Sequence, residues 1–146
     1  MYKVWFRRKI NALATHVNVR AWISVYRSKF YINGEKLKVL DICAGSGGFV
    51  EGLVCENLIH EGVSMDQNFP TSPLNHNFIV CDITQPIKED VSFKPDLISI
   101  NNSIQLFSDP TVFCRYVKYY KPRYIFITKP TELVIDCLIE RGCNLN

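Results

Sequence analysis

The sequence predicts an α/β protein with a mostly parallel sheet and helices on both faces. Apolar segments of strand length alternate with amphipathic segments of helix length, and polar residues recur where the apolar segments end. With 146 residues, of which 47% are apolar, the chain can bury one hydrophobic core but not two. We therefore expect one α/β domain over residues 35–146, preceded by a basic, aromatic arm or helix over residues 1–34.

Strands and helices are expected in alternation after the arm. The expected strands are 37–42, 62–65, 77–81, 96–100 and 124–128, and the expected helices are 47–58, 109–120 and 131–141. Asp109-Pro110 is typical of a helix N-cap followed by a proline in the first turn, and Gly142 is typical of a C-cap. Right-handed crossovers through such helices place successive strands parallel to one another.

The nine residues DICAGSGGF, Asp41–Phe49, connect the first expected strand to its helix. Three glycines within residues 45–48 let the backbone turn sharply and let a ligand approach it closely. A helix that begins at or just after Ser46 directs its unpaired N–H groups into the same space, and Asp41 suits a cationic or hydroxyl-rich ligand. The spacing departs from the G-x-G-x-x-G pattern of dinucleotide sites, which favours S-adenosylmethionine over a nicotinamide cofactor.

Polar residues stand at the ends of all five expected strands. They are Asp41, Asp66, Asp82, Asn101 and Lys129. Ligands of open parallel sheets bind outside the carboxyl ends of the strands, so we expect these residues to face one site.

The first 38 residues are strongly basic, with nine Lys or Arg against a single acid, whereas the remainder holds eight bases and thirteen acids. Basic residues interleaved with aromatic ones suit a phosphate backbone and stacked bases, so nucleic-acid contact is expected. The candidate contacts are Arg7, Arg8, Lys9, Arg20 and Arg27. Two other interpretations stay open: the apolar spacing of residues 6–17 also fits a solvated amphipathic helix, and the lack of acids in residues 1–34 also fits a mitochondrial presequence.

Cysteine, histidine and hydropathy patterns bound the class of protein. The six cysteines include no C-x-x-C pair, and no hydrophobic secretory segment precedes them, so we expect reduced thiols in an intracellular, cytoplasmic or nuclear protein. The three histidines lack metal-ligand spacing, and no apolar run reaches about 18 residues. Neither a metal site nor a membrane span is expected.

At these motifs the chain resembles the FtsJ-like ribose 2′-O-methyltransferases, and more closely their mRNA cap-methylating branch, over residues 27–141. DICAGSGGF is similar to that branch's D-x-C-A-G-P-G-G-F loop, with Ser46 in place of the proline. CDITQP, Cys81–Pro86, is similar to its G-D-I-T-x-P segment, and FITKP, Phe126–Pro130, to the strand that ends in its second catalytic lysine. The resemblance implies a Rossmann-like methyltransferase fold, S-adenosylmethionine as cofactor, and RNA, particularly capped mRNA, as substrate.

The resemblance also implies a role for each matching residue. Asp41, Cys43, Ala44, Gly45, Ser46, Gly47, Gly48 and Phe49 would hold the methionine part of the cofactor, Asp66 its ribose hydroxyls and Asp82 its adenine. In the family a Lys-Asp-Lys-Glu tetrad orients or deprotonates the 2′-hydroxyl. Lys129 matches the second lysine, and Lys29 is the candidate for the first.

Two departures from the family pattern bear on activity. Asn101 stands at the position of the tetrad's aspartate. The tetrad's glutamate would be expected at a position after Asn146, the last residue of the sequence. The last strands of the usual seven-stranded sheet are also expected to be missing, which would leave an edge for a protein partner to cover. Small, reduced cap-modifying domains of this kind would fit a virus.

Three functions follow from these observations. The first is an RNA (cap) ribose 2′-O-methyltransferase or a weakened relative of one. The second is a non-catalytic, methyltransferase-like subunit that binds RNA or assembles a larger complex. The third is an amino-methyltransferase, because residues 101–104, Asn-Asn-Ser-Ile, occupy the place of that class's Asn-Pro-Pro-Tyr/Phe, although both prolines and the aromatic ring are absent.

Overall fold

The computed structural model describes residues 3–7, 15–87, 91–101, 109, 111–128, 132–140 and 142–145. Its strands are β1 (Lys3–Arg7), β2 (Leu37–Ile42), β3 (Ile59–Asp66), β4 (Asn77–Val80), β5 (Leu97–Asn101), β6 (Tyr124–Thr128) and β7 (Asn144–Leu145). Its helices are α1 (Thr15–Phe30), α2 (Gly48–Cys55), α3 (Val112–Tyr120) and α4 (Glu132–Glu140). Within these segments, no helix has the length and apolar character needed to cross a bilayer.

The strands form one sheet in the order β4-β3-β2-β5-β6-β1-β7, and they pair in parallel. The central strands β2, β5 and β6 are almost continuously buried, as strands covered on both faces must be. The predicted α/β class with a parallel sheet is therefore confirmed. The expected strands 37–42 and 124–128 match β2 and β6, whereas β3 begins at Ile59 rather than at Gly62.

The sheet continues beyond β6, which corrects the expectation that its last strands are missing. β1 pairs with β6 from Lys3 opposite Tyr124 to Arg7 opposite Thr128, and β7 pairs with the other side of β1. The expected arm or helix thus begins with a strand, because its valine and aromatic residues favour a strand and β6 offers an open edge. The edge that was expected to need a protein partner is covered by the chain's own N-terminal strand.

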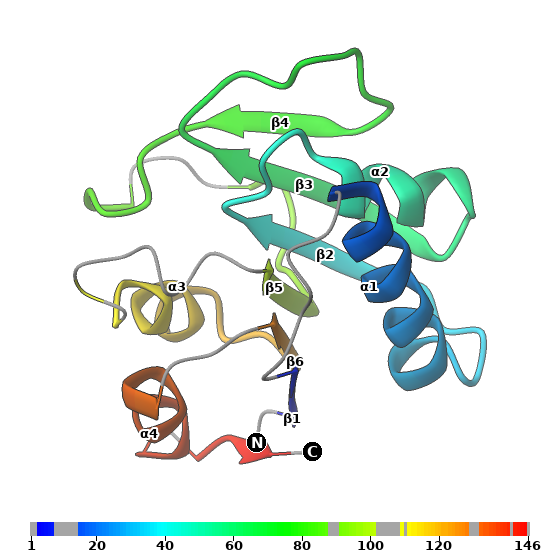
Figure 1. Ribbon diagram of the computed structural model, residues 1–146. Helices are drawn as coiled ribbons and strands as arrows, with labels where there is room; N and C mark the ends of the chain where they lie inside the picture. The colour runs from blue at the N-terminus through cyan, green and yellow to red at the C-terminus, as the bar shows by residue number, and fades with distance from the viewer. Residues whose placement is uncertain are drawn as a thin grey trace.

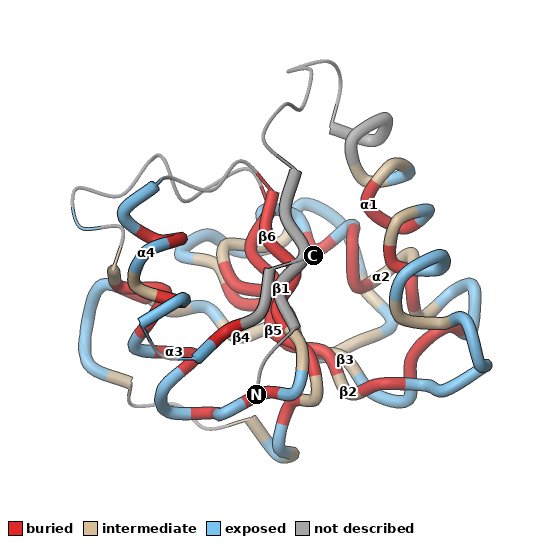
Figure 2. Tube along the Cα trace, turned by 90° about the horizontal axis from the view of Figure 1, so that it is seen from below, coloured by how far each residue is buried: buried red, intermediate tan, exposed pale blue. Residues whose placement is uncertain are grey.

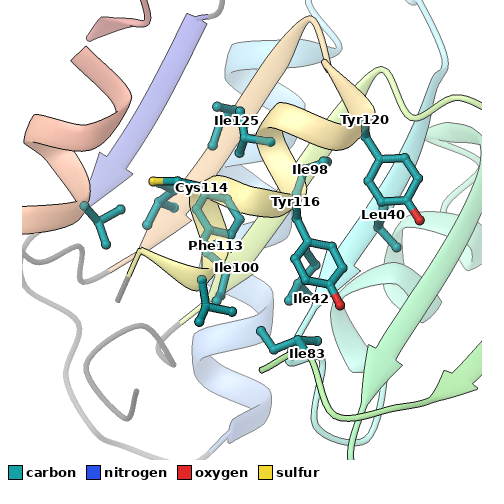
Figure 3. Close-up of a cluster of buried hydrophobic side chains, with 14 of the residues drawn as sticks. Leu40, Ile42, Ile83, Ile98, Ile100, Phe113, Cys114, Tyr116, Tyr120 and Ile125 are labelled. Carbon is teal, nitrogen blue, oxygen red and sulfur yellow. The ribbon is translucent and has the colours of Figure 1, made fainter. Parts of the chain in front are cut away.

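Helices cover both faces of the sheet, with α1 and α2 on one side and α3 and α4 on the other (Figure 1). Buried residues are concentrated along the strands and on the helix sides that face them (Figure 2). Tyr26 of α1 and Phe49 of α2 pack with Phe126 in one core cluster. Phe113 of α3 packs with Ile98 in the other, among the side chains drawn in Figure 3.

Helix α1 runs along the strands, from the side of the sheet where the strands end to the side where they begin. Near its start, the Val19 side chain lies beside Gly48, which follows the carboxyl end of β2. At its end, the ring of Phe30 lies 5.4 Å from that of Tyr124, the first residue of β6. We call these the carboxyl edge and the amino edge of the sheet, after the strand ends that form them.

Candidate functional site

The loop of residues 43–47 leaves β2 at the carboxyl edge with three left-handed residues. Cys43, Gly45 and Gly47 have φ values of 56°, 61° and 82°. The Ala44 N–H donates to the carbonyl of Met65 on β3 at 2.8 Å, and the Gly47 N–H donates to the Ala44 carbonyl at 3.0 Å. Gly47 is the N-cap of α2, so the helix begins directly after the loop.

Asp41 lies beneath this loop and is only 2% exposed. The Ser99 hydroxyl on the neighbouring strand β5 donates to its Oδ1 at 2.6 Å. Burial raises the pKa of Asp41 to about 7, and the nearby charge of Asp66 adds to the rise, although the Ser99 hydrogen bond opposes it. Burial also raises the pKa of the Cys43 thiol to about 12, so this side chain is a neutral part of the site and not a nucleophile.

Asp66 ends β3 and joins that strand to the loop. Its Oδ1 accepts a hydrogen bond from the Gly45 N–H at 3.3 Å, and its Oδ2 accepts one from the Asn68 N–H at 3.1 Å. A carboxylate offers about four lone-pair positions, so Asp66 keeps the capacity to accept from ligand hydroxyls.

A pocket of about 230 Å³ lies where β3, β4 and α3 meet. Its lining residues are Met65, Val80, Cys81, Asp82, Gln85, Pro86, Ile87 and Tyr116. The Thr84 hydroxyl and N–H donate to Asp82 at 2.6 and 2.9 Å, and these two hydrogen bonds lower the pKa of Asp82. The pocket is therefore mostly apolar with an ionised acceptor at its rim, which suits a flat ring with polar edge groups.

A buried polar network fixes the start of α2, and the sequence reasoning missed it. His76 Nδ1 lies 2.7 Å from Glu51 Oε2, and His76 Nε2 lies 2.7 Å from Ser64 Oγ. Asn75 donates to Glu51 from its backbone N–H and from its side-chain amide. Ser64, His76 and Glu51 contact one another in the order of the serine, histidine and acid of a hydrolase triad. Ser64 is fully buried and no substrate can reach it, so the network is structural.

The segment of residues 67–76, which we call the strap, contacts the glycine loop directly. Thr71 Oγ1 lies 3.2 Å from Ser46 Oγ. A Cβ atom on Gly47 would lie 2.9 Å from Leu74 Cδ1 and 3.4 Å from the His76 ring. The strap thus lies against the loop on one side. The φ of Gly47 favours glycine, and an added Cβ would also require the Leu74 side chain to shift.

Glu51→Gln is expected to lower the free energy of unfolding by roughly 1–3 kcal/mol, because buried His76 and the Asn75 amides lose an ionised acceptor. Burial alone would raise the pKa of Glu51, but hydrogen bonds from Asn75 and His76 bring it below its usual value. The wild-type protein should therefore lose this stabilisation as the pH falls below about 4.3 and through the lowered folded pKa. Urea unfolding of both proteins at several pH values measures the effect.

Glu61→Gln is the matched control for this prediction. The Glu61 carboxylate lies 3.7 Å from His60, and both side chains are exposed. Removing an exposed pair changes stability by at most about 1 kcal/mol. Equal losses in the two variants would contradict a stabilising role for the buried network.

Asn101 and the end of β6 lie at the same edge as the glycine loop. Asn101 ends β5 and is 6% exposed. In the sheet register it lies opposite Thr128, which in turn lies opposite Arg7 of β1. Lys129 follows Thr128 and falls outside the described residues.

Lys29 and Arg27 lie at the amino edge, away from the glycine loop. Both belong to the last turn of α1, where Lys29 is exposed and Arg27 pairs with Glu56, the C-cap residue of α2. The structure does not bring Lys29 together with Asn101, so we assign Lys29 no part in the mechanism.

The remaining basic candidates differ in where they fall. Arg20 is exposed on α1 and follows Val19, the neighbour of Gly48, so it lies near the carboxyl edge. Arg8 and Lys9 lie outside the described residues. Among the residues that are described, no group of His, Cys, Asp and Glu side chains is placed to hold a metal ion.

Comparison with known proteins identifies the fold. No protein-family model and no curated protein matches the sequence. The plantazolicin methyltransferase BpumL in complex with SAH aligns with 77% of this chain at a TM-score of 0.55 and 19% identity. The PH0226 protein from Pyrococcus horikoshii OT3 aligns with 81% of it at 0.53 and 21%. The chain spans 45% and 58% of these two proteins, and it shares its Rossmann-like fold with the BpumL methyltransferase.

Proposed function

We propose that this chain binds S-adenosylmethionine at the carboxyl edge and methylates ribose 2′-hydroxyls of RNA, capped mRNA in particular. The cofactor part of the proposal rests on the left-handed glycine loop, which is tied to Asp66 through Gly45 and lies above the buried acid Asp41. The RNA part rests on the resemblance of the loop and of residues 81–86 to cap methyltransferases, and on the basic first 38 residues.

The residues at this edge fit the parts of the cofactor. A Cβ on Gly45 would meet nothing within 4 Å, so the backbone there is open to the methionine part of the cofactor. Its ammonium group would lie above the buried carboxyl of Asp41 and favour the ionised form of that acid. Asp66 would accept from the ribose hydroxyls, and the pocket beside Asp82 would take the adenine. The bound cofactor supplies an electrophilic methyl group, so the chain has only to align the ribose oxygen and help to remove its proton.

Orientation of the ribose 2′-hydroxyl is assigned to the charged form of Lys129 in this proposal. Lys129 directly follows Thr128, which lies opposite Asn101 in the sheet. An acid at position 101 would hold the lysine in its charged form, whereas an amide leaves only a neutral acceptor there. Asn101 therefore predicts weakened activity.

Calorimetry with SAH is the direct test of the cofactor site. Micromolar binding, accompanied by a rise in the unfolding temperature, is expected because a ligand that binds only the folded state must stabilise it. A folded sample that binds no SAH would contradict the proposal.

Asn101→Asp is expected to raise methyl transfer to capped RNA by about tenfold, because a carboxylate would fix the charged Lys129 by a charge-assisted hydrogen bond worth roughly 1.5 kcal/mol or more. SAH affinity should barely change, because position 101 is not assigned a cofactor contact. Single-turnover transfer from labelled cofactor measures the gain, with Asn101→Leu as the uncharged control. Equal rates for all three proteins would count against a weakened enzyme.

A non-catalytic RNA-binding subunit is the second candidate, and Asn101 is the observation that favours it. This candidate predicts RNA binding that is indifferent to SAH, together with no gain in transfer on Asn101→Asp. The proposed enzyme predicts the opposite in both measurements.

A further inference from the structure

Phe69 is an apolar residue with no role in either core. Its side chain is 79% exposed, the largest value among the exposed large hydrophobic side chains of the described residues, and neither core cluster includes it. Burying a phenylalanine side chain stabilises a fold by roughly 1.5–3 kcal/mol, so full exposure forgoes that contribution. The exposed ring is therefore available to a ligand.

The strap holds Phe69 in one place despite its exposure. On one side, the Asn68 N–H donates to Asp66, and on the other side Thr71 contacts Ser46 of the glycine loop. Pro70 follows the phenylalanine and restricts its backbone to extended conformations. The backbone that carries the ring is therefore held in place on the rim of the proposed cofactor site.

The surroundings of this rim favour a nucleic acid as the ligand. Arg20 is exposed on the part of α1 that contacts Gly48, at the same edge of the sheet. Arg7, the last residue of β1, lies opposite Thr128 at that edge as well. A fixed aromatic ring combined with basic side chains is how proteins hold single-stranded nucleic acids, through base stacking and phosphate contacts.

We infer that Phe69 is a stacking platform for a nucleobase of the single-stranded RNA substrate. This inference rests on the proposed function and deepens it, because it identifies how the RNA is held beside the cofactor. The adenine of the cofactor is assigned to the pocket next to Asp82, whose lining does not include Phe69, so the ring is left for a substrate base.

The test compares RNA binding by the wild type, Phe69→Ala and Phe69→Trp, measured by fluorescence anisotropy with a short labelled oligoadenylate. Phe69→Ala is expected to weaken binding roughly 5- to 150-fold, the range for loss of one base–aromatic stack, while Phe69→Trp retains it. An abasic oligomer of the same length keeps the phosphates, so it should bind all three proteins equally.

Ile32→Ala is the matched surface control. Ile32 is 72% exposed in the turn after α1, at the amino edge, and its removal should change no affinity. Because Phe69 is exposed, its replacement should leave the unfolding temperature unchanged.

Equal oligoadenylate affinities for wild type and Phe69→Ala would overturn the inference, as would a wild type that binds no RNA. A loss of SAH affinity in Phe69→Ala with unchanged RNA binding would also overturn it, by assigning the ring to the cofactor. Failure of the proposed function is distinguishable, because it shows as absent SAH binding by the wild type in calorimetry.

Discussion

Gly47→Ala is expected to abolish SAH binding at micromolar concentrations and to destabilise the fold. The residue has φ of 82°, a region that costs a residue with a Cβ roughly 1–2 kcal/mol. Its new Cβ would also lie 2.9 Å from Leu74 Cδ1 and 3.4 Å from the His76 ring. The Leu74 side chain must shift, and the strained backbone at the N-cap alters the start of α2, where the cofactor is proposed to bind.

Gly45→Ala separates backbone strain from crowding in this experiment. Gly45 also has a positive φ, 61°, but an added Cβ would meet nothing within 4 Å. Its cost in urea unfolding should therefore be the strain alone, and smaller than that of Gly47→Ala. If Gly45→Ala and Gly47→Ala unfold at the same urea concentration, the contact of the new Cβ at position 47 with Leu74 adds nothing to the backbone strain.

Much of the sheet could be predicted from the sequence because its signals are local. β6 is an apolar run that ends in a polar residue, β2 is mostly apolar, and the glycines after Asp41 mark a turn whatever surrounds them. Because the carboxyl ends of parallel strands lie at the same edge of a sheet, the sequence also predicted that Asp41, Asp66 and Asn101 lie at one edge.

The features that escaped prediction depend on contacts between residues far apart in the sequence. β1 forms a strand because β6 offers it an edge, and nothing near residues 3–7 announces that partner. The contact of His76 with Ser64 and Glu51 arises only when the strap folds back over α2. Such long-range pairings leave no periodic pattern to read.

Asp41→Asn is expected to remove a pH dependence of stability and, with it, much of the cofactor affinity. Burial raises the folded pKa of Asp41 to about 7, well above the unfolded value of about 3.9. The folded state therefore keeps a proton that the unfolded state has released, so wild-type stability should fall as the pH rises from about 4 to about 7. The total loss is at most roughly 4 kcal/mol.

The variant cannot ionise, so this decline should disappear while the amide oxygen still accepts from Ser99. Asp82→Asn is the control: Asp82 is exposed and has a lowered pKa, so replacing it should leave the decline intact. Urea unfolding at intervals between pH 4 and pH 8 measures all three proteins. A decline that persists in Asp41→Asn would assign the titration to another group.

Cofactor binding should depend on the ionisation of the same Asp41 carboxyl, but the SAH affinity should rise with pH where the stability falls. An ammonium group beside Asp41 favours the ionised carboxyl, so wild-type SAH affinity should fall by up to tenfold for each unit below pH 7. Binding near pH 7 should also release protons, which calorimetry in buffers of different ionisation enthalpy detects. Asp41→Asn should bind SAH weakly at pH 8 and without that proton release. If Asp41→Asn bound SAH tightly and without releasing protons, the ammonium group would lie elsewhere. The Asp41 carboxyl, whose ionisation destabilises the unliganded protein, would then have no part in binding the cofactor.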